Sequence, residues 1–323
     1  MPEWCNVPHN KLQIEPRVLA HMSNDTYLQS PYIEGGDLYV DAAMKMYSER
    51  YGMERHQFLE ADDVTWREKG LPMHPRDLFK RGLLSTMYGT SAFGLSTMLD
   101  VTVEDAQQFI DDFHESFPIA HQYAKDCHAF VDKHGYCETM GGRKRRFPAY
   151  SFTNKKTKET VEVPKHTDLA KMYHSGMAQA ERILGEPVTN VWQSDLPFKL
   201  KQSLGFATRF YNSNLRQIVN ARTQGSAAEA IKKAMISVEK VLQEKGSEWL
   251  LIATVHDEIL LEIPDTAAEK DFRDIEAAMV NAMQLVVPLK TDIAIMQRWS
   301  EDVTLDKWLE DGLNCFDEKG FKK

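Results

Sequence analysis

The stretch from residue 249 to residue 263 constrains the fold most strongly. An apolar run, Trp249–Val255, precedes three polar residues, His256, Asp257 and Glu258, and a second apolar run, Ile259–Ile263, follows them. Two short runs rich in branched side chains, joined by a few polar residues, predict a β-hairpin with the polar residues at its tip.

The two carboxylates at this tip admit two interpretations. Neighbouring negative charges repel each other, and a hard divalent cation with oxygen ligands would relieve that repulsion. A solvated acidic turn explains the same residues equally well, because acidic residues are common in turns. The hairpin alone therefore does not distinguish a metal site from an ordinary turn.

Composition narrows the class of protein. The 323 residues suffice for two domains or one large one, and 42% hydrophobic with 27% charged residues is typical of a soluble globular chain. No run of 18 apolar residues and no signal peptide occur, which predicts a cytoplasmic protein without a membrane partner. The net charge of −9 argues only weakly against nucleic-acid binding, because local basic patches matter more than the sum.

Four scattered cysteines show no metal-ligand spacing: Cys5, Cys127, Cys137 and Cys315. They predict free thiols in a reducing compartment.

Residues 76–89 predict a helix that starts just after Pro75 and ends before Gly89. Four-residue steps keep four of its residues on one side: Arg76, Lys80, Leu84 and Tyr88. Such a side could hold a polyphosphate at one end and a ring at the other. An amphipathic surface helix with solvated cations is the simpler explanation of the helix taken alone.

Other segments predict further elements. A strand over residues 135–140 leads through two glycines into four cations, residues 143–146, which predict a mobile phosphate-seeking loop or a solvated turn. Helices are expected over about 101–118, 119–133, 168–184, 226–243 and 266–285, and a last strand over 289–295. Residues 152–206 carry the weakest pattern, and Trp308 and Phe316 look like isolated anchors in a polar tail.

Three segments in order resemble the motifs of the family A DNA polymerases, the bacterial Pol I and T7-like phage class. Residues 13–23 resemble motif A, residues 76–95 motif B, and residues 255–258 motif C. The connecting blocks 135–148 and 216–235 resemble the family too, so the resemblance runs from residue 13 to residue 300. A phage origin is plausible from this resemblance.

The resemblance implies an α+β polymerase right-hand fold, with an antiparallel palm sheet and helical fingers but without the thumb and exonuclease domain. The implied parts are palm with motif A at 1–30, mainly fingers at 31–205, palm with motif C at 206–300 and a tail at 301–323. The implied activity is that of a DNA-directed DNA polymerase, with primer–template DNA and deoxynucleoside triphosphates (dNTPs) as partners and two Mg²⁺ ions as cofactors.

The resemblance also implies roles for single residues. Asp257 and Glu258 are the implied metal ligands and, with Lys80, the implied catalytic residues. The implied nucleotide contacts are Arg76, Lys80, Leu84, Tyr88 and Glu15. The implied DNA contacts are Arg216, Asn220, Gln224, His256, Arg143 and Arg145.

Two positions depart from the family pattern. Asn10 stands where the family has the motif A metal-binding Asp, and a neutral amide is a poorer ligand for a hard cation. Leu84, followed by Ser85, stands where the family carries Phe or Tyr followed by Gly. Asn10 predicts severely impaired activity for this chain by itself, and Leu84 predicts weaker packing against the sugar.

Residues 1–12 look unrelated to the family strand expected there. The sequence therefore suggests a split or intron-interrupted gene whose upstream polypeptide or exon carries the thumb and exonuclease domain. The alternative is a catalytically inactive, polymerase-like DNA-binding subunit. Retention of Arg76, Lys80 and Asp257 favours the first interpretation, because an inactive subunit does not need a triphosphate clamp.

Overall fold

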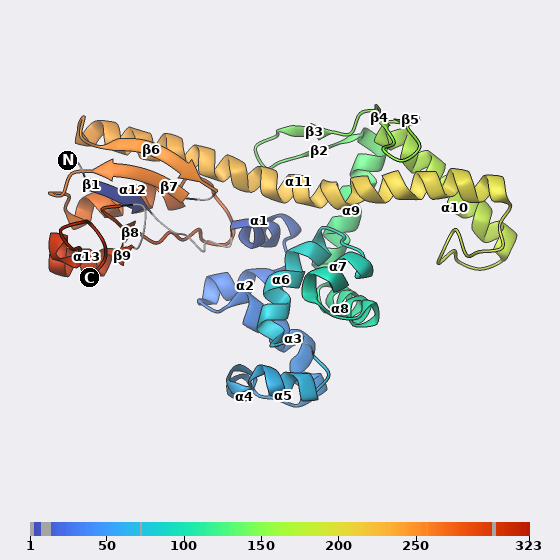
Figure 1. Cartoon of the computed structure of the whole chain (residues 1–323), viewed down its shortest axis with the longest axis horizontal. Coiled ribbons are helices and arrows are strands. Elements are labelled where there is room, and N and C mark those ends of the chain that lie inside the picture. The colour runs from blue at the N-terminus through green and yellow to red at the C-terminus, as the bar shows by residue number, and fades with distance from the viewer. Residues whose placement is uncertain (1–2, 8–13, 72, 257, 299–301) are drawn as a thin grey trace. The chain divides into compact units, whose positions relative to one another are not determined.

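A computed structural model forms the basis of the description, and Figure 1 shows it. The described residues are 3–7, 14–71, 73–256, 258–298 and 302–323. They fall into two compact units, which we call the sheet unit (1–22, 28–36 and 226–323) and the helical unit (23–27 and 37–225). Whether these units correspond to the predicted palm and fingers stays a prediction.

A three-stranded antiparallel sheet forms the centre of the sheet unit. Its order is β1 (Glu3–Val7), β7 (Glu258–Ile263) and β6 (Leu250–Val255). The predicted hairpin is confirmed, because Val255 pairs with Glu258 across a two-residue turn. His256 in this turn has a φ of +56°, the left-handed conformation that two-residue hairpin turns require. Asp257 lies outside the described residues.

Residues 3–7, within the segment that the sequence suggested was unrelated to the implied family strand, form strand β1 of this sheet. Glu3 pairs with Ile263 and Val7 pairs with Ile259, so β1 extends the sheet along the far side of β7. A five-residue strand between Pro2 and Pro8 is too short to produce a recognisable apolar alternation. The buried residues of β7, by contrast, make it a suitable central strand with a partner on each side.

One hydrophobic cluster fastens a helix and the C-terminal elements to this sheet. Phe272 and Ile275 of α12 (Glu269–Val280) are fully buried in it, together with Ile259 of β7. Trp308 and Phe316 belong to the same cluster, with ring centroids 6.4 Å apart, so they are not the isolated anchors that the sequence suggested. The other elements of the unit are α1 (Ile14–Ser23), α2 (Thr26–Glu34), β8 (Ala294–Ile295), β9 (Val303–Thr304), α13 (Leu305–Asp311) and η1 (Gly312–Cys315).

The helical unit begins with a series of helices around an aromatic core. The helices are α3 (Leu38–Tyr51), α4 (Arg55–Glu60), α5 (Asp63–Glu68), α6 (Pro75–Met87), α7 (Ala92–Leu99), α8 (Val103–Ser116) and α9 (Pro118–His134). The ring of Phe113 lies 4.9 Å from that of Phe117 and 6.3 Å from that of Phe79. Thr102 is the N-cap of α8, and its hydroxyl oxygen accepts a hydrogen bond from the backbone N–H of Asp105 at 3.1 Å.

Two small hairpins and two long helices complete the helical unit. They are β2 (Tyr136–Glu138) with β3 (Lys144–Arg146), β4 (Tyr150–Thr153) with β5 (Thr160–Val163), α10 (His166–Leu184) and α11 (Phe198–Lys245). The basic run is therefore mainly a strand and not a loop. Helix α11 passes through Gly225, although the sequence predicted a helix only from about residue 226, and its residues from Ser226 onward belong to the sheet unit.

A polar network around a half-buried carboxylate joins α9, α10 and α11. The carboxylate of Asp132 accepts hydrogen bonds from His166 Nε2 at 2.7 Å, His174 Nε2 at 2.9 Å and the Tyr211 hydroxyl at 2.8 Å. Burial acts to raise the pKa of Asp132, but these three hydrogen bonds outweigh it and the net pKa is lowered. The carboxylate therefore stays ionised and holds α10 against its neighbours.

Two features bear on the chemical environment of the chain. Cys127, Cys137 and Cys315 are buried free thiols, and burial raises the pKa of Cys127 and Cys137. Within the described residues, no helix combines the length and the apolar character needed to cross a membrane.

The packing of α8 on α9 generates a pH prediction. The His114 and His121 rings stack at 3.7 Å, and burial together with His114 lowers the pKa of His121 to about 4. The folded state therefore keeps His121 neutral, whereas an unfolded histidine protonates near pH 6.5. Stability is lost as the pH falls from about 6.5 towards 4, because the unfolded chain binds the extra proton.

We expect His121→Gln to flatten this part of the stability curve, measured as the urea midpoint between pH 7 and about 4. His56→Gln, at an exposed position of α4, is the matched control and should leave the slope of the parent. Equal slopes for the parent and the His121 variant would contradict the assignment.

Candidate nucleic-acid interface

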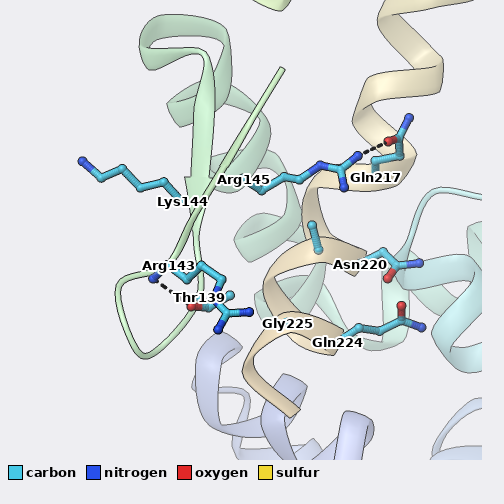
Figure 2. Close-up of a pocket in the computed structure, with 9 residues that line it drawn as sticks. Thr139, Arg143, Lys144, Arg145, Gln217, Asn220, Gln224 and Gly225 are labelled. Carbon is cyan, nitrogen blue, oxygen red and sulfur yellow. Dashed lines mark hydrogen bonds between the residues drawn. The ribbon is translucent and has the colours of Figure 1, made fainter. Parts of the chain in front are cut away.

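A cavity of about 460 Å³ opens between the β2–β3 hairpin and α11 in the helical unit. Figure 2 shows the cationic side chains coming from the hairpin and the amide side chains from the helix. The lining residues are Thr139, Arg143, Lys144, Arg145, Gln217, Asn220, Ala221, Gln224 and Gly225. Four predicted DNA contacts, Arg143, Arg145, Asn220 and Gln224, therefore meet in one site.

Helical spacing explains why the amide side chains of α11, which we call the amide wall, line the cavity together. Gln217, Asn220 and Gln224 are three and four residues apart, so they share one face of α11. Gln217 was not among the predicted residues, because the helix was expected to start later. Extending the helix back to residue 217 would have placed this third amide on the same face.

A close approach at Gly225 brings the hairpin against the helix. A Cβ at Gly225 would lie 2.6 Å from Thr139 Cγ2, a distance at which something must shift. The hydroxyl of Thr139 in turn accepts the backbone N–H of Arg143 at 3.1 Å. The glycine thus lets the hairpin sit close enough to present Arg143 to the cavity.

Arg143, Lys144 and Arg145 form the cationic wall of the cavity, and their positive charges favour the binding of anions. Arg145 Nη2 donates to Gln217 Oε1 at 2.8 Å, which links the two walls. Hydrogen bonding to Glu138 and Tyr136 raises the pKa of Lys144, whose Nζ lies 3.3 Å from a Glu138 carboxylate oxygen. Cations opposite amides can pair with phosphate oxygens on one side and hydrogen-bond base or sugar edges on the other.

Helix α6 carries the predicted triphosphate contacts in the same unit. Lys80 is exposed, whereas Arg76, Leu84 and Tyr88 are half-buried. Arg76 donates to the Asp37 carboxylate from Nη2 at 2.8 Å and from Nε at 3.1 Å. The Asp37 carboxylate also caps the N-terminus of α3, so the same side chain both caps this helix and binds Arg76.

Arg216 of α11 lies beside the end of α6. Its Cγ is 3.8 Å from the position that a Cβ on Gly89 would occupy. Gly89 has a φ of +77°, a conformation that favours glycine.

The remaining predicted residues belong to the sheet unit. Glu258 starts β7 half-buried, His256 is exposed in the β6–β7 turn, and Glu15 is half-buried in the first turn of α1. Asn10 and Asp257 lie outside the described residues. Within the described part of the chain, no group of three or more His, Cys, Asp or Glu side chains could hold a metal ion.

The fold agrees with what comparison with known proteins shows. The family model of DNA polymerase family A matches residues 3–164 and 188–301. DNA polymerase I of Lactococcus lactis subsp. cremoris is 29% identical over 289 residues, covering 90% of this chain and 25% of that protein. The thermostable DNA polymerase I of Thermus aquaticus is 27% identical over 296 residues, covering 92% and 27%. The chain thus spans about a quarter of the length of these relatives.

A solved structure supports the same class. The polymerase domain of Pol1 from M. smegmatis, in complex with DNA primer–template and dNTP, aligns with a TM-score of 0.62 at 22% identity. The alignment covers 93% of this chain and 40% of that one, and it shows an α+β polymerase fold. The chain belongs to the family A DNA polymerases. The family match begins at residue 3, which corrects the inference that the resemblance stops at Gln13.

The close approach at Gly225 generates a prediction. Gly225→Ala gains about 1 kcal/mol of helix propensity yet forces Thr139 away. We expect weaker binding of duplex DNA, measured by fluorescence anisotropy, because the hairpin moves out of place.

Thr139→Ser keeps the hydroxyl that accepts from Arg143 and removes the clashing methyl. The double variant Thr139→Ser/Gly225→Ala should therefore recover most of the lost affinity, with Thr139→Ser alone as the control. Unchanged affinity in Gly225→Ala would show that the close approach does not position the cationic wall.

Proposed function

We propose that the protein carries out template-directed DNA synthesis, transferring nucleotides from dNTPs to a primer 3′-hydroxyl. The observation that carries this proposal is the cavity in which Arg143 and Arg145 face Asn220 and Gln224, in a chain of the family A DNA polymerases. Phosphate contacts from the arginines would position a duplex, and the amides would reach its minor groove, where all base pairs offer similar acceptors.

The substrate roles follow the motif B helix. Arg76 and Lys80 would bind the triphosphate, and Lys80 would also stabilise negative charge on the departing pyrophosphate. Tyr88 would stack near the templating base and sense the geometry of the pair. Leu84 would pack against the sugar of the incoming nucleotide, and Glu15 would lie under that sugar. Arg216 and His256 would contact the primer terminus.

Two Mg²⁺ ions are the proposed cofactors, held by Asp257 and Glu258. Adjacent carboxylates at a hairpin tip are the oxygen donors that this ion prefers, and the confirmed turn places Glu258 at the start of β7. When bound, the ions would neutralise charge on the transferred phosphate. Asn10 offers a neutral oxygen where a third carboxylate is expected, which would weaken metal binding.

The full reaction is proposed to draw on an upstream polypeptide or exon that supplies a thumb, with the protein acting in the cytoplasm. A phage origin and a T7-like subtype stay predictions. The alternative function is a catalytically inactive DNA-binding subunit, which Asn10 and Leu84 favour.

Primer extension with Mg²⁺ separates these functions. We expect weak extension by the chain, an increase in Asn10→Asp, and a further increase when an upstream fragment is added. Lys80→Ala should then lower kcat by about 100-fold or more, because it removes a cation from the leaving group. Absence of extension in every combination would support the inactive-subunit alternative.

The Arg76–Asp37 pair generates a prediction about nucleotide affinity. Asp37→Asn retains an oxygen that can cap α3 but removes the negative charge that holds Arg76. We expect dNTP to bind about two- to fivefold more tightly, since a half-exposed ion pair no longer competes with the triphosphate.

Asp77→Asn is the control, because its carboxylate lies 3.8 Å from Arg76 Nη1 and is more exposed. Weaker dNTP binding in Asp37→Asn would mean that Asp37 instead holds Arg76 in its binding position.

A further inference from the structure

The positive charge of the chain is concentrated in one segment of the helical unit. Residues 141–216 contain 14 Lys and Arg against 6 Asp and Glu, a net charge of +8, in a chain whose net charge is −9. The other 247 residues therefore carry −17. This segment includes β3 and the β4–β5 hairpin, and it contains residues 165–187, which the family model does not match.

The tip of the β4–β5 hairpin presents three exposed lysines, Lys155, Lys156 and Lys158. The Asn154 side chain accepts the backbone N–H of Lys156 at 2.9 Å, and the backbone N–H of Lys158 donates to the Asn154 carbonyl at 2.8 Å. Among the described residues, none of the three lysines forms an ion pair with a carboxylate. Lys158 has a φ of +61°, in the left-handed region where Gly or Asn is the usual residue. Lys158 therefore occupies a position at which the backbone conformation favours Gly or Asn.

Packing fixes this hairpin to α11. The Phe152 ring of β4 lies 6.0 Å from that of Phe210, and Val163 of β5 is buried in the same cluster as Leu169 and Phe210. The backbone N–H of His166 donates to the Phe147 carbonyl at 3.1 Å, and Asp132 binds the His166 ring. The lysines therefore stand on an anchored support, which lowers the entropic cost of binding a ligand.

The two hairpins lie along one stripe of α11. Four of the α11 residues that pack with β4–β5 or line the cavity fall within about 40° of one another at 100° per residue: Phe206, Phe210, Gln217 and Gln224. Figure 1 shows both hairpins along this part of α11. Phe206 and Gln224 are about 27 Å apart along the axis at 1.5 Å per residue. That length corresponds to about eight base pairs of duplex DNA.

We propose that the β4–β5 tip, with Lys155, Lys156 and Lys158, is a second, sequence-independent binding site for the phosphate backbone of duplex DNA leaving the cavity. This inference rests on the proposed function, because the cavity supplies the first contact with the duplex. Three lysines on an anchored hairpin track a polyanion without reading its bases. The site provides local positive charge for binding DNA on a chain whose net charge is negative.

The test measures the affinity of the full chain for a fluorescent primer–template duplex as a function of salt. The tip variant is Lys155→Ala/Lys156→Ala/Lys158→Asn, in which Asn tolerates the left-handed backbone of position 158. The matched control is Lys319→Ala/Lys322→Ala/Lys323→Ala, which removes the same charge from exposed positions of the sheet unit. A third variant replaces the tip lysines with arginine.

We expect the tip variant to bind at least about tenfold more weakly at 0.1 M salt. Its plot of log affinity against log salt concentration should become shallower by about 2.7, or about 0.9 per lost phosphate contact. The control and the arginine variant should keep the parent slope. Equal losses in the tip variant and the control would overturn the inference, because only net charge would then matter.

Arg145→Ala/Asn220→Ala separates this inference from the proposed function. Loss of affinity in this cavity variant but not in the tip variant overturns the second site and leaves the proposed function standing. Loss in both variants supports the second site, whereas loss in the tip variant alone overturns it together with the role of the cavity, because the inference rests on a duplex that leaves the cavity. Loss of binding to phosphatidylserine vesicles in the tip variant, with unchanged DNA affinity, overturns the assignment to DNA.

Discussion

The close contact between Thr139 and Gly225 is the constraint on which the candidate interface depends. Any side chain at Gly225 would meet Thr139 Cγ2, so the β2–β3 hairpin can approach α11 only at a glycine. The same threonine closes the hairpin by accepting the Arg143 N–H. One contact therefore sets both the distance between the two walls and the direction of the cationic side chains.

Predictability from sequence followed the strength of local patterns. The β6–β7 hairpin and α8 were predicted because strong apolar periodicity and a Thr102 cap act within a few residues of each other. The helix was expected to begin only after Gly225, and the contact that requires a glycine there comes from Thr139, 86 positions away in the chain. Tertiary contacts of this kind leave no periodic signal.

In the candidate site, too, the sequence predicted some residues, whereas the tertiary contacts between distant residues were not expected. Arg143, Arg145, Asn220 and Gln224 were each implied as DNA contacts by the family resemblance, and they line one cavity. The partner of Arg76 was not expected, since Asp37 caps α3 and lies 39 positions away in the chain. The strand at residues 3–7 was missed because a short strand is defined by its neighbour, β7, more than by its own composition.

The network around Asp132 has a consequence for how the helical unit opens. The Asp132 carboxylate accepts hydrogen bonds from two histidines on α10 and a tyrosine on α11. Breaking any of these bonds leaves the ionised carboxylate less well solvated. Helix α10 should therefore not fray turn by turn from its N-terminal half. Its amide protons there should exchange with solvent together, in one cooperative opening, making α10 and the β4–β5 hairpin a single folding subunit of the chain.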